Sequence, residues 1–344
     1  MVAMTTADAA SPLSPAPAGH AGPDRVLILP PTDQRVGTPY ADAHEGPTRA
    51  ARGAGGSVVA NNAREPGGDG SATALVLVRP IPVEQVEAAL AANPGVSWVQ
   101  LPFAGIEPYV PLIRSRSGIT WTSAKGTYAP PVAEHALMLT LALLRDLPAR
   151  IRATSWGTAG GRTLEGMDCV IVGGGGIARE YLRLLKAWDT RVTIVRRSAG
   201  EVPGADRTVT QDRLDEVLPG AGVVMVAAAA TDLTRGMIGA RQLELMDPDA
   251  VLVNIARGTL VDTDALVAAL AAGSIHAAGL DVTDPEPLPE GHPLWAEPRC
   301  IVTPHTADTP EMCIPLLDAR IGRNLAARAT GATLEGRVDP VGGY

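Results

Sequence analysis

Three apolar, strand-like segments end in residues that could carry out chemistry. Arg257 follows VLVNIA, Asp281 follows HAAGL with Glu286 in the loop beyond it, and His305 follows RCIVTP. An arginine can bind a carboxylate through two parallel hydrogen bonds, and a histidine can donate or accept a proton near neutral pH. A glutamate beside that histidine would stabilise the imidazolium and fix its orientation. Because ligands of open α/β sheets bind beyond the carboxyl ends of the strands, the pattern predicts an active site there.

Each of these residues, taken alone, has a simpler structural role. A lone arginine at a strand end is more often half of a surface ion pair, a histidine after proline is more often a turn residue, and a glutamate between prolines is usually just solvated. The combination beside a dinucleotide-binding loop is what favours catalysis. With a nicotinamide in the same crevice, Arg257, Glu286 and His305 predict hydride transfer to a 2-keto acid, with His305 protonating the carbonyl oxygen, and the reverse oxidation of a 2-hydroxy acid.

The dinucleotide loop is the segment VIVGGGGIARE, which contains G-x-G-x-x-A as Gly173, Gly175 and Ala178. It follows a predicted strand and opens a predicted helix, the context in which this motif is specific. The first glycine permits a tight turn, and the second lets backbone N–H groups approach a pyrophosphate, with Gly176 and Ile177 at the helix N-terminus. The alternative is a glycine turn with no nucleotide, which this context disfavours.

The end of the next predicted strand indicates which dinucleotide binds. NAD-binding loops place an acid there to hold the ribose 2′-hydroxyl, but this chain has Arg196, Arg197 and Ser198. Two guanidinium groups and a hydroxyl can pair with a 2′-phosphate. A solvated basic turn is the alternative. We therefore expect NADP(H) to be preferred, with NAD(H) possible.

The elements that must position these residues alternate regularly. From Met167 onward, apolar strand-like runs alternate with helix-like segments, which predicts a parallel sheet covered on both faces and an α/β fold. A shorter alternation precedes it, ending near Thr127. The helix-like segment Pro131–Leu147 is apolar on nearly every side, so it should be buried at a domain junction or against a second subunit.

Composition excludes several classes of protein. The chain has 344 residues, 46% of them apolar, a net charge of −8 and a pI of about 5.3, so nucleic acid and anionic membranes are poor partners. The three cysteines lie far apart, which predicts neither a disulfide nor a metal site and indicates a reducing, cytoplasmic location. Residues 1–23 form a Pro/Ala-rich tail that we expect to be disordered and not a signal peptide. No apolar run is long enough to span a membrane.

The segments VIVGGGGIARE, NIARGTLVDTDAL, GLDVTDPEPLP, HPLW and TPHTA, in this order, resemble the signature segments of the D-isomer-specific 2-hydroxyacid dehydrogenase family. The resemblance covers about Val26 to Leu334. It implies that Arg257 binds the substrate carboxylate, that His305 is the acid/base and that Glu286 is its partner.

The resemblance also implies further site residues and a domain plan. Thr231, Ala256 and Asp281 would lie at the cofactor, and the backbone amides of Ala104 and Gly105 would bind substrate. Two Rossmann-like domains are implied, a cofactor domain (129–309) inserted into a substrate domain (24–128 and 310–344), with a homodimer formed through the helix around Pro131–Leu147.

Two departures from the family and several alternatives stay open. Ala229 stands where family members often have proline, and the arginines after the second strand resemble those of NADP-preferring glyoxylate/hydroxypyruvate reductases. Glyoxylate, hydroxypyruvate and bulkier 2-keto acids are all candidate substrates. A nucleotide-sensing binding protein with little turnover, or a dehydrogenase of formate or phosphite, would share the same motifs.

Overall fold

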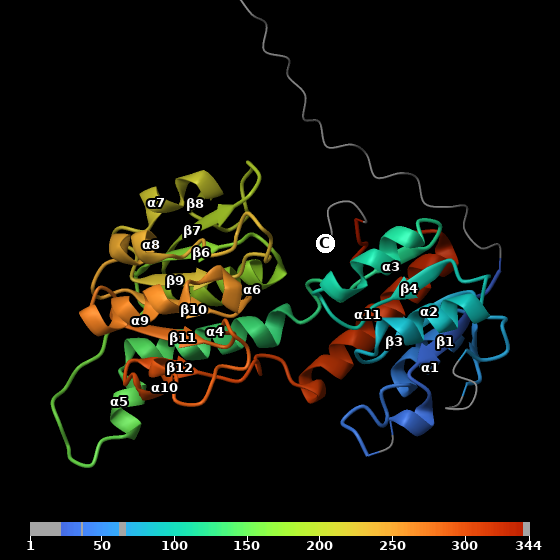
Figure 1. The fold of residues 1–344 in the computed structure, drawn as a ribbon. Coiled ribbons are helices and arrows are strands. Elements are labelled where there is room, and N and C mark those ends of the chain that lie inside the picture. The colour runs from blue at the N-terminus through green and yellow to red at the C-terminus, as the bar shows by residue number, and fades with distance from the viewer. Residues whose placement is uncertain (1–21, 36, 62–66, 340–344) are drawn as a thin grey trace, which may run out of the picture. The chain divides into compact units, whose positions relative to one another are not determined.

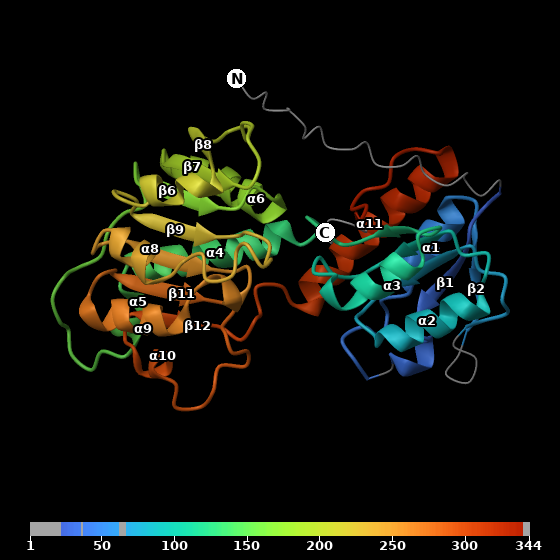
Figure 2. The ribbon, with the colours of Figure 1, turned by 45° about the horizontal axis from the view of Figure 1, so that its top comes forward.

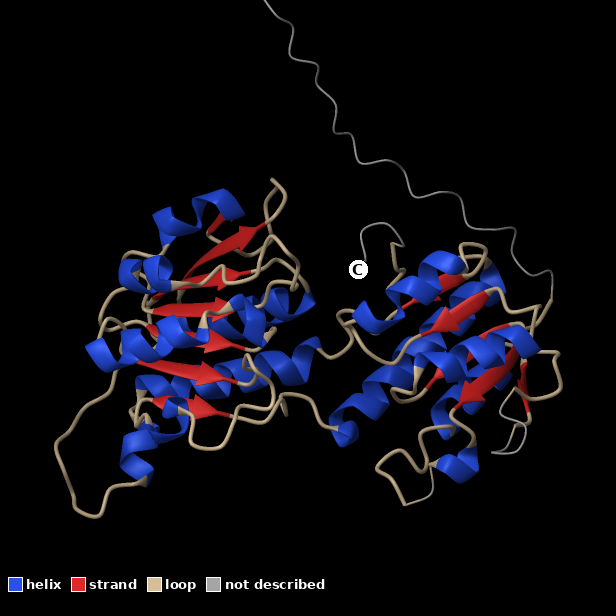
Figure 3. Cartoon of the chain, in the orientation of Figure 1, coloured by secondary structure: helices blue, strands red, loops and turns tan. Residues whose placement is uncertain are grey.

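The computed structural model describes residues 22–35, 37–61 and 67–339, so most of the predicted tail 1–23 lies outside the described residues (Figure 1). The chain divides into two compact units: unit 1 comprises residues 1–125 and 313–344, and unit 2 comprises residues 126–312. Each unit has its own parallel sheet with helices packed against it (Figure 3). The predicted α/β class with two parallel-sheet domains is confirmed.

The sheet of unit 2 has seven strands in the order β12-β11-β10-β9-β6-β7-β8, and all neighbours are parallel. Continuous apolar runs form its central strands because both faces are covered. The edge strand β8 was not anticipated, since only Val209 of its sequence RTVT is buried. The strands are β6 (Asp168–Val172), β7 (Arg191–Arg196), β8 (Arg207–Thr210), β9 (Val223–Val226), β10 (Val251–Asn254), β11 (Ala277–Leu280) and β12 (Cys300–Val302).

Helices cover both faces of this sheet, and a separate apolar cluster fills each side. Helix α9 has side-chain and glycine caps at its two ends: the Asp262 carboxylate accepts from the Ala265 N–H, and Gly273 ends the helix at φ 70°. The helices are α4 (Ala129–Leu144), α5 (Leu147–Ile151), α6 (Gly176–Leu185), α7 (Leu214–Val217), α8 (Ala240–Leu245), α9 (Thr263–Ala272) and α10 (Pro293–Ala296).

The all-round apolar helix of the sequence is α4, and the core of unit 2 accounts for much of its apolarity. Ala136, Leu139 and Leu143 are buried in the cluster that α4 shares with α6 and the sheet. Its buried hydroxyl, that of Thr140, contacts the Tyr181 hydroxyl at 2.7 Å. The side chain of Met138 is 45% exposed, so part of the helix surface is left uncovered within this chain.

Unit 1 has a five-stranded parallel sheet in the order β2-β1-β3-β4-β5. Figure 2 shows β1 and β2 side by side in this sheet. Its strands are β1 (Arg25–Leu29), β2 (Ser57–Val59), β3 (Ala74–Leu77), β4 (Trp98–Gln100) and β5 (Thr120–Thr122). Its helices are α1 (Glu45–Gly53), α2 (Val83–Ala92) and α3 (Val110–Ser115), together with α11 (Pro310–Thr330), which begins in the last residues of unit 2. Among the described residues, no helix is long and apolar enough to cross a membrane.

Candidate active site

Three neighbouring strands of unit 2 bring the predicted catalytic residues to one edge of the sheet. In the parallel register Asn254 pairs with Leu280, and Leu280 pairs with Val302, so β10, β11 and β12 end together. Arg257 and His305 lie just beyond two of these ends. The sheet therefore gathers residues that are far apart in the sequence.

His305 and Glu286 form a direct contact at this edge. The imidazole Nδ1 lies 2.7 Å from Glu286 Oε1, and the two side chains are 46% and 43% exposed. Because a carboxylate only accepts hydrogen bonds, the geometry places a proton on Nδ1. Nε2, which has no partner among the residues that the structure describes, is then the nitrogen that can exchange a proton with a ligand.

The backbone of His305 adopts a left-handed conformation, with φ 50°. Such a conformation costs on the order of 1 kcal/mol or more for a residue with a side chain, and it occurs often at functional sites. The His305 N–H donates to the Asp281 carbonyl at 2.9 Å, which ties the residue to the end of β11. The strained position is therefore held by its surroundings.

Asp281 supplies most of that support. The residue is only 2% exposed. Its carboxylate accepts hydrogen bonds from the Thr303 hydroxyl (2.6 Å), the Thr306 N–H (2.9 Å) and the Ala307 N–H (3.0 Å). The family resemblance placed Asp281 at the cofactor. The structure shows its carboxylate shaping the loop that carries His305. Thr303, which also lies 3.0 Å from His135 Nε2, was missed because no sequence pattern marks its contact with Asp281.

The guanidinium of Arg257 contacts a backbone carbonyl, and it forms no ion pair with a carboxylate of the described residues. Its Nη1 donates to the Ala256 carbonyl at 2.7 Å, and no acidic side chain within the described ranges lies within ion-pair distance of it. A surface ion pair, the simpler role for this arginine, therefore has no partner to support it. Most of the five guanidinium donors are left to bind a ligand carboxylate.

The turn that carries Arg257 packs tightly against the loop that leads to Glu286. A side chain at Gly258 would collide with the backbone of Thr283, so only glycine permits this approach. Asn254 is fully buried, donates to the Arg257 carbonyl at 3.0 Å and accepts from the Ala256 N–H at 3.1 Å. Asn254 was missed as a shaping residue, since asparagines are common at strand ends without any link to a site.

The glycine loop has the geometry that a pyrophosphate requires. Gly173 has φ 125°, and a side chain there would collide with the Ala227 carbonyl. Gly175 and Gly176 are exposed at the start of α6, where the N-cap position carries no side chain, and Ile177 follows half-buried. The residues present therefore fit a dinucleotide, because backbone N–H groups and the helix N-terminus are open to an anion.

Arg196 lies beside this loop. A Cβ added at Gly174 would touch the Arg196 side chain at 3.4–3.5 Å, and Arg196 Nη2 donates to the Ser198 hydroxyl at 3.1 Å. Arg197 and Ser198 are exposed. The basic cluster predicted from the sequence is thus adjacent to the glycine loop at Arg196.

Thr234 holds the loop that contains Ala229 and Thr231. Its hydroxyl donates to the Ala229 carbonyl at 2.8 Å and accepts from the Thr231 N–H at 2.8 Å, while the Thr231 residue itself is exposed. The loop is therefore fixed by hydrogen bonds without a proline at position 229. Thr234 was missed, because a threonine in a loop carries no distinctive signal.

Ala104 and Gly105 lie in unit 1, beyond β4, whereas the other predicted site residues lie in unit 2. Ala104 is exposed and Gly105 half-buried. Neither backbone N–H has an acceptor within the part of the chain that the structure describes. Two unsatisfied amides in succession on a loop are ready to bind an oxygen-bearing ligand.

Comparisons with known proteins agree with this geometry. Residues 136–307 match the family model described as D-isomer specific 2-hydroxyacid dehydrogenase, NAD binding domain. An uncharacterised Corynebacterium melassecola protein encoded in the proB 3′ region is 37% identical over 72% of this chain and 84% of its own length. A glyoxylate reductase of Aeropyrum pernix is 32% identical over 63% of this chain and 68% of its own.

A solved structure extends the similarity to nearly the whole chain. The D-isomer specific 2-hydroxyacid dehydrogenase of Xanthobacter autotrophicus Py2, in complex with NADPH and MES, matches with a TM-score of 0.74 and 25% identity, over 94% of this chain and 100% of that one. The family-model match spans the strands that carry Arg257, Glu286 and His305. The chain therefore belongs to the D-isomer specific 2-hydroxyacid dehydrogenase family and is an oxidoreductase that uses a nicotinamide cofactor.

Proposed function

We propose that this protein reduces a small 2-keto acid with NADPH and, in reverse, oxidises the 2-hydroxy acid. The observation that carries the proposal is the 2.7 Å contact between His305 Nδ1 and Glu286 Oε1, at the sheet edge that also holds Arg257. In this proposal unit 2 binds the cofactor and unit 1 contributes the loop that binds the substrate. The glyoxylate reductase among the relatives supports a small 2-keto acid as substrate.

The chain's own residues then have distinct roles. Arg257 binds the substrate carboxylate through two parallel hydrogen bonds, and the amides of Ala104 and Gly105 donate to substrate oxygens. His305 Nε2 donates a proton to the carbonyl oxygen during reduction and removes it during oxidation. Glu286 keeps the proton on Nδ1 and stabilises the imidazolium. When bound, the reduced nicotinamide supplies the hydride for the carbonyl carbon.

The preference for NADPH rests on Arg196 and its neighbours. A 2′-phosphate beside Gly174 would meet the Arg196 guanidinium and the Ser198 hydroxyl, which are already in contact with each other. Arg197 would add a second cation. The NADPH bound to the Xanthobacter autotrophicus relative supports the same cofactor for this chain. The residues for the rest of the cofactor would be Gly173, Gly175, Gly176, Ile177, Thr231, Ala256 and Asp281.

Steady-state kinetics with NADPH and NADH test the cofactor and the reaction together. Glyoxylate, hydroxypyruvate and a bulkier 2-keto acid are each offered with both cofactors, and we expect turnover with a lower KM for NADPH than for NADH. Replacing Arg196 and Arg197 by Asp and Pro should raise the KM for NADPH at least about tenfold, the scale of one lost charge-assisted contact, and leave NADH use equal or better. Arg207→Gln is the matched control, because Arg207 begins strand β8 at the amino edge of the sheet.

The other outcomes of this experiment point to other functions. Tight NADPH binding without turnover of any 2-keto acid would indicate a nucleotide-sensing protein. Turnover of formate or phosphite in place of 2-keto acids would indicate a dehydrogenase of those anions. A lower KM for NADH in the unmodified protein would remove the phosphate-binding role of Arg196 and Arg197.

We also propose that α4 and the residues after it form a homodimer interface. Met138 and Leu147 are 45% exposed, Ile151 is 73% exposed and Trp156 is fully exposed. Large apolar side chains grouped along one segment are typical of a protein–protein contact. Sedimentation equilibrium should give twice the mass of one chain, and a monomer at micromolar concentration would contradict the proposal.

A cytoplasmic location is supported by the thiols. Cys169 and Cys300 are buried, and burial raises the pKa of each thiol to about 12. They behave as small apolar core residues, and neither is paired in a disulfide among the described residues. We propose on this basis that the protein works in a reducing compartment.

A further inference from the structure

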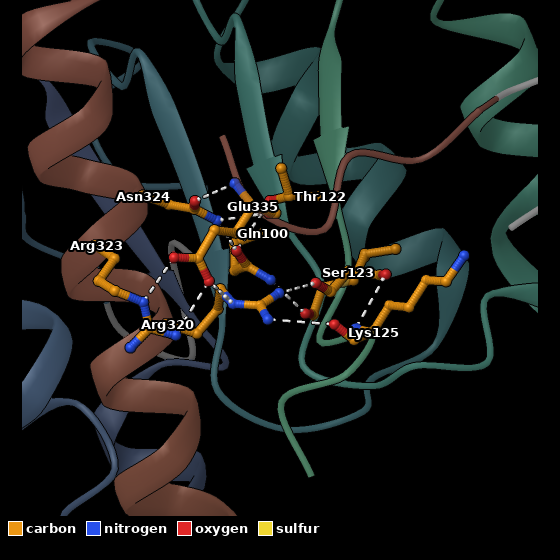
Figure 4. Close-up of polar contacts among 9 residues, drawn as sticks. Gln100, Thr122, Ser123, Lys125, Arg320, Arg323, Asn324 and Glu335 are labelled. Atoms are coloured by element: carbon orange, nitrogen blue, oxygen red, sulfur yellow. Dashed lines mark hydrogen bonds and ion pairs between the residues drawn. The ribbon is translucent and has the colours of Figure 1, made fainter. Parts of the chain in front are cut away.

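A buried polar network in unit 1 joins helix α11 to the end of strand β4, just before the loop that contains Ala104 and Gly105. Figure 4 shows Asn324 and Gln100 in this network. Gln100 ends strand β4, and Asn324 lies on α11; both are fully buried. Asn324 Nδ2 donates to Gln100 Oε1 at 2.9 Å, across 224 residues of sequence. Gln100 Nε2 donates in turn to the carbonyl of Leu101 at 2.8 Å, where the loop begins.

The surrounding donors fix the orientation of the Gln100 amide. The Trp98 indole N–H donates to the Thr122 hydroxyl at 2.9 Å, and an indole can only donate. The Thr122 hydroxyl lies 2.9 Å from Gln100 Oε1 and can give it its own proton. Since Asn324 also donates to Oε1, the amide oxygen faces two donors and the amide nitrogen must face the Leu101 carbonyl.

Asn324 is oriented just as firmly by the segment after α11. Its Oδ1 accepts from the Glu335 N–H at 2.8 Å, and its Nδ2 also donates to the Glu335 carbonyl at 3.1 Å. Every polar atom of the Asn324 side chain thus has a partner. A buried amide this completely satisfied specifies one arrangement of the backbone around it.

The loop itself is held where it begins. The Leu101 N–H donates to the Thr122 carbonyl at 2.8 Å, and the Ala124 N–H donates to the Phe103 carbonyl at 2.9 Å. Together with the Gln100 contact, these bonds fix residues 101–103, and the free amides of Ala104 and Gly105 come immediately after. Amides held in place before the ligand arrives bind it at a lower entropic cost.

We propose that Gln100 and Asn324 are positioning residues that aim the Ala104 and Gly105 amides at the substrate. This inference rests on the proposed function, in which those amides bind the 2-keto acid. Neither side chain touches the substrate. Weakening the pair should therefore raise the KM for the 2-keto acid and leave the KM for NADPH unchanged, because the cofactor residues lie in unit 2.

Asn324→Asp tests the pair with almost no change in shape. It keeps the acceptor for the Glu335 N–H and places a carboxylate oxygen, in place of a donor, against Gln100 Oε1. We expect the KM for the 2-keto acid to rise about five- to tenfold, the scale of one net hydrogen bond, with little change in the KM for NADPH. Gln100→Glu removes the Nε2 group that donates to the Leu101 carbonyl, and it should raise the KM for the 2-keto acid in the same way. This second variant keeps the test valid if Asn324→Asp does not fold.

Asn93→Asp is the matched control. Asn93 is also a buried asparagine of unit 1; it accepts from the Ala72 N–H and donates to the carbonyls of Gly67 and Ala89, away from the substrate loop. The Asn93→Asp substitution should lower the midpoint of thermal unfolding about as much as Asn324→Asp does. It should leave the KM values for the 2-keto acid and for NADPH unchanged. An unchanged KM for the 2-keto acid in both Asn324→Asp and Gln100→Glu would overturn the positioning role.

Ala104→Pro separates this inference from the proposed function, because proline removes one of the two loop amides. If Ala104→Pro raises the KM for the 2-keto acid and the two network variants do not, the loop binds substrate and the positioning pair is wrong. If Ala104→Pro has no effect either, the substrate role of the loop fails and the inference fails with it.

Discussion

The carboxyl edges of the two sheets carry different chemistry. In unit 2 the edge presents ionisable side chains, with His305 and Glu286 nearly half exposed. In unit 1 the corresponding edge presents backbone amides, those of Ala104 and Gly105. On the proposed function, a sheet edge thus supplies either groups that react or groups that only bind, depending on the residues that come after its strands.

Behind each edge, a buried polar side chain holds the loop that presents these groups. In unit 2 the Asp281 carboxylate accepts three hydrogen bonds from the loop 303–307. In unit 1 the neutral Gln100 amide donates to the loop and is itself held by Asn324. In both units, the groups presented at the edge therefore depend on a buried side chain that holds their loop in place.

The largest effect should come from the reactive group of the unit 2 edge. His305→Gln removes the proposed proton donor, so kcat should fall by about 10²- to 10⁴-fold, while the dissociation constant for NADPH, measured by fluorescence titration, stays close to its original value. His276→Gln is the matched control, since His276 in the same unit pairs with Asp146 at 2.9 Å. Near-normal turnover in His305→Gln would end the acid/base assignment and leave both edges as binding surfaces only.

Arg257→Lys should have the next largest effect, although the charge is kept. Lysine cannot make two parallel hydrogen bonds to a carboxylate. We expect kcat/KM for the 2-keto acid to fall. The fall should correspond to a loss of about 2 to 4 kcal/mol of transition-state stabilisation, the range for breaking a desolvated charge pair. Arg299→Lys, at the amino end of β12, should change kcat/KM very little. Equal, small effects of the two substitutions would return Arg257 to a structural role.

Glu286→Gln should lower turnover without abolishing it. The amide keeps the size of the side chain but loses the charge, so it stabilises the imidazolium of His305 less well than the carboxylate that lies 2.7 Å from Nδ1. We expect kcat for ketoacid reduction to fall by about tenfold, the scale of a lost charge-assisted hydrogen bond, with the KM for NADPH unchanged. Steady-state kinetics check this, and an unchanged kcat would remove Glu286 from the mechanism.

The smallest expected effect is on stability. It concerns Asp318, whose carboxylate lacks, among the described residues, a set of hydrogen bonds like the three that Asp281 accepts. Asp318 on α11 packs against Gly46 of α1, and burial raises its pKa to about 6, with Arg49 opposing and Glu45 adding to the rise. Because the folded state holds the proton more tightly than the unfolded chain, stability should fall as pH rises from about 4 to 6.

Asp318→Asn removes this penalty. The free energy of unfolding at pH 7.5 should increase by about 1 kcal/mol, well below the full value for such a shift because the side chain is only partly buried. The gain should vanish near pH 4. Urea unfolding at both pH values measures it, and an equal gain at the two would show that the ionised carboxylate is not the cause.

Much of unit 2 could be predicted from the sequence, because its elements carry local signals. The apolar runs of β6, β9 and β10, the cap of α9 and the conformation of Gly173 all obey short-range rules. The edge strand β8 could not be predicted, since its polar residues alternate around one buried valine. Prediction is reliable where a segment is buried on both faces and weak at the edge of a sheet.

The buried supports of the site could not be predicted at all. Asp281 was placed by resemblance at the cofactor, and its contacts with the loop 303–307 depend on two strands lying side by side. The pair Gln100 and Asn324 is 224 residues apart, and Thr234 holds the loop around Ala229 through its hydroxyl. Such contacts arise only after the chain is folded, so no spacing or composition marks them in advance.

The discontinuity of unit 1 has a consequence for the order in which the protein forms. Unit 2 is one continuous segment and can fold as soon as residues 126–312 have left the ribosome. Unit 1 must wait for α11, which supplies Asn324 to Gln100 and Arg328 to Asp24 across 304 residues. During synthesis, Gln100 and Asp24 therefore lack these partners longest, and chaperone binding to the nascent chain should concentrate on unit 1.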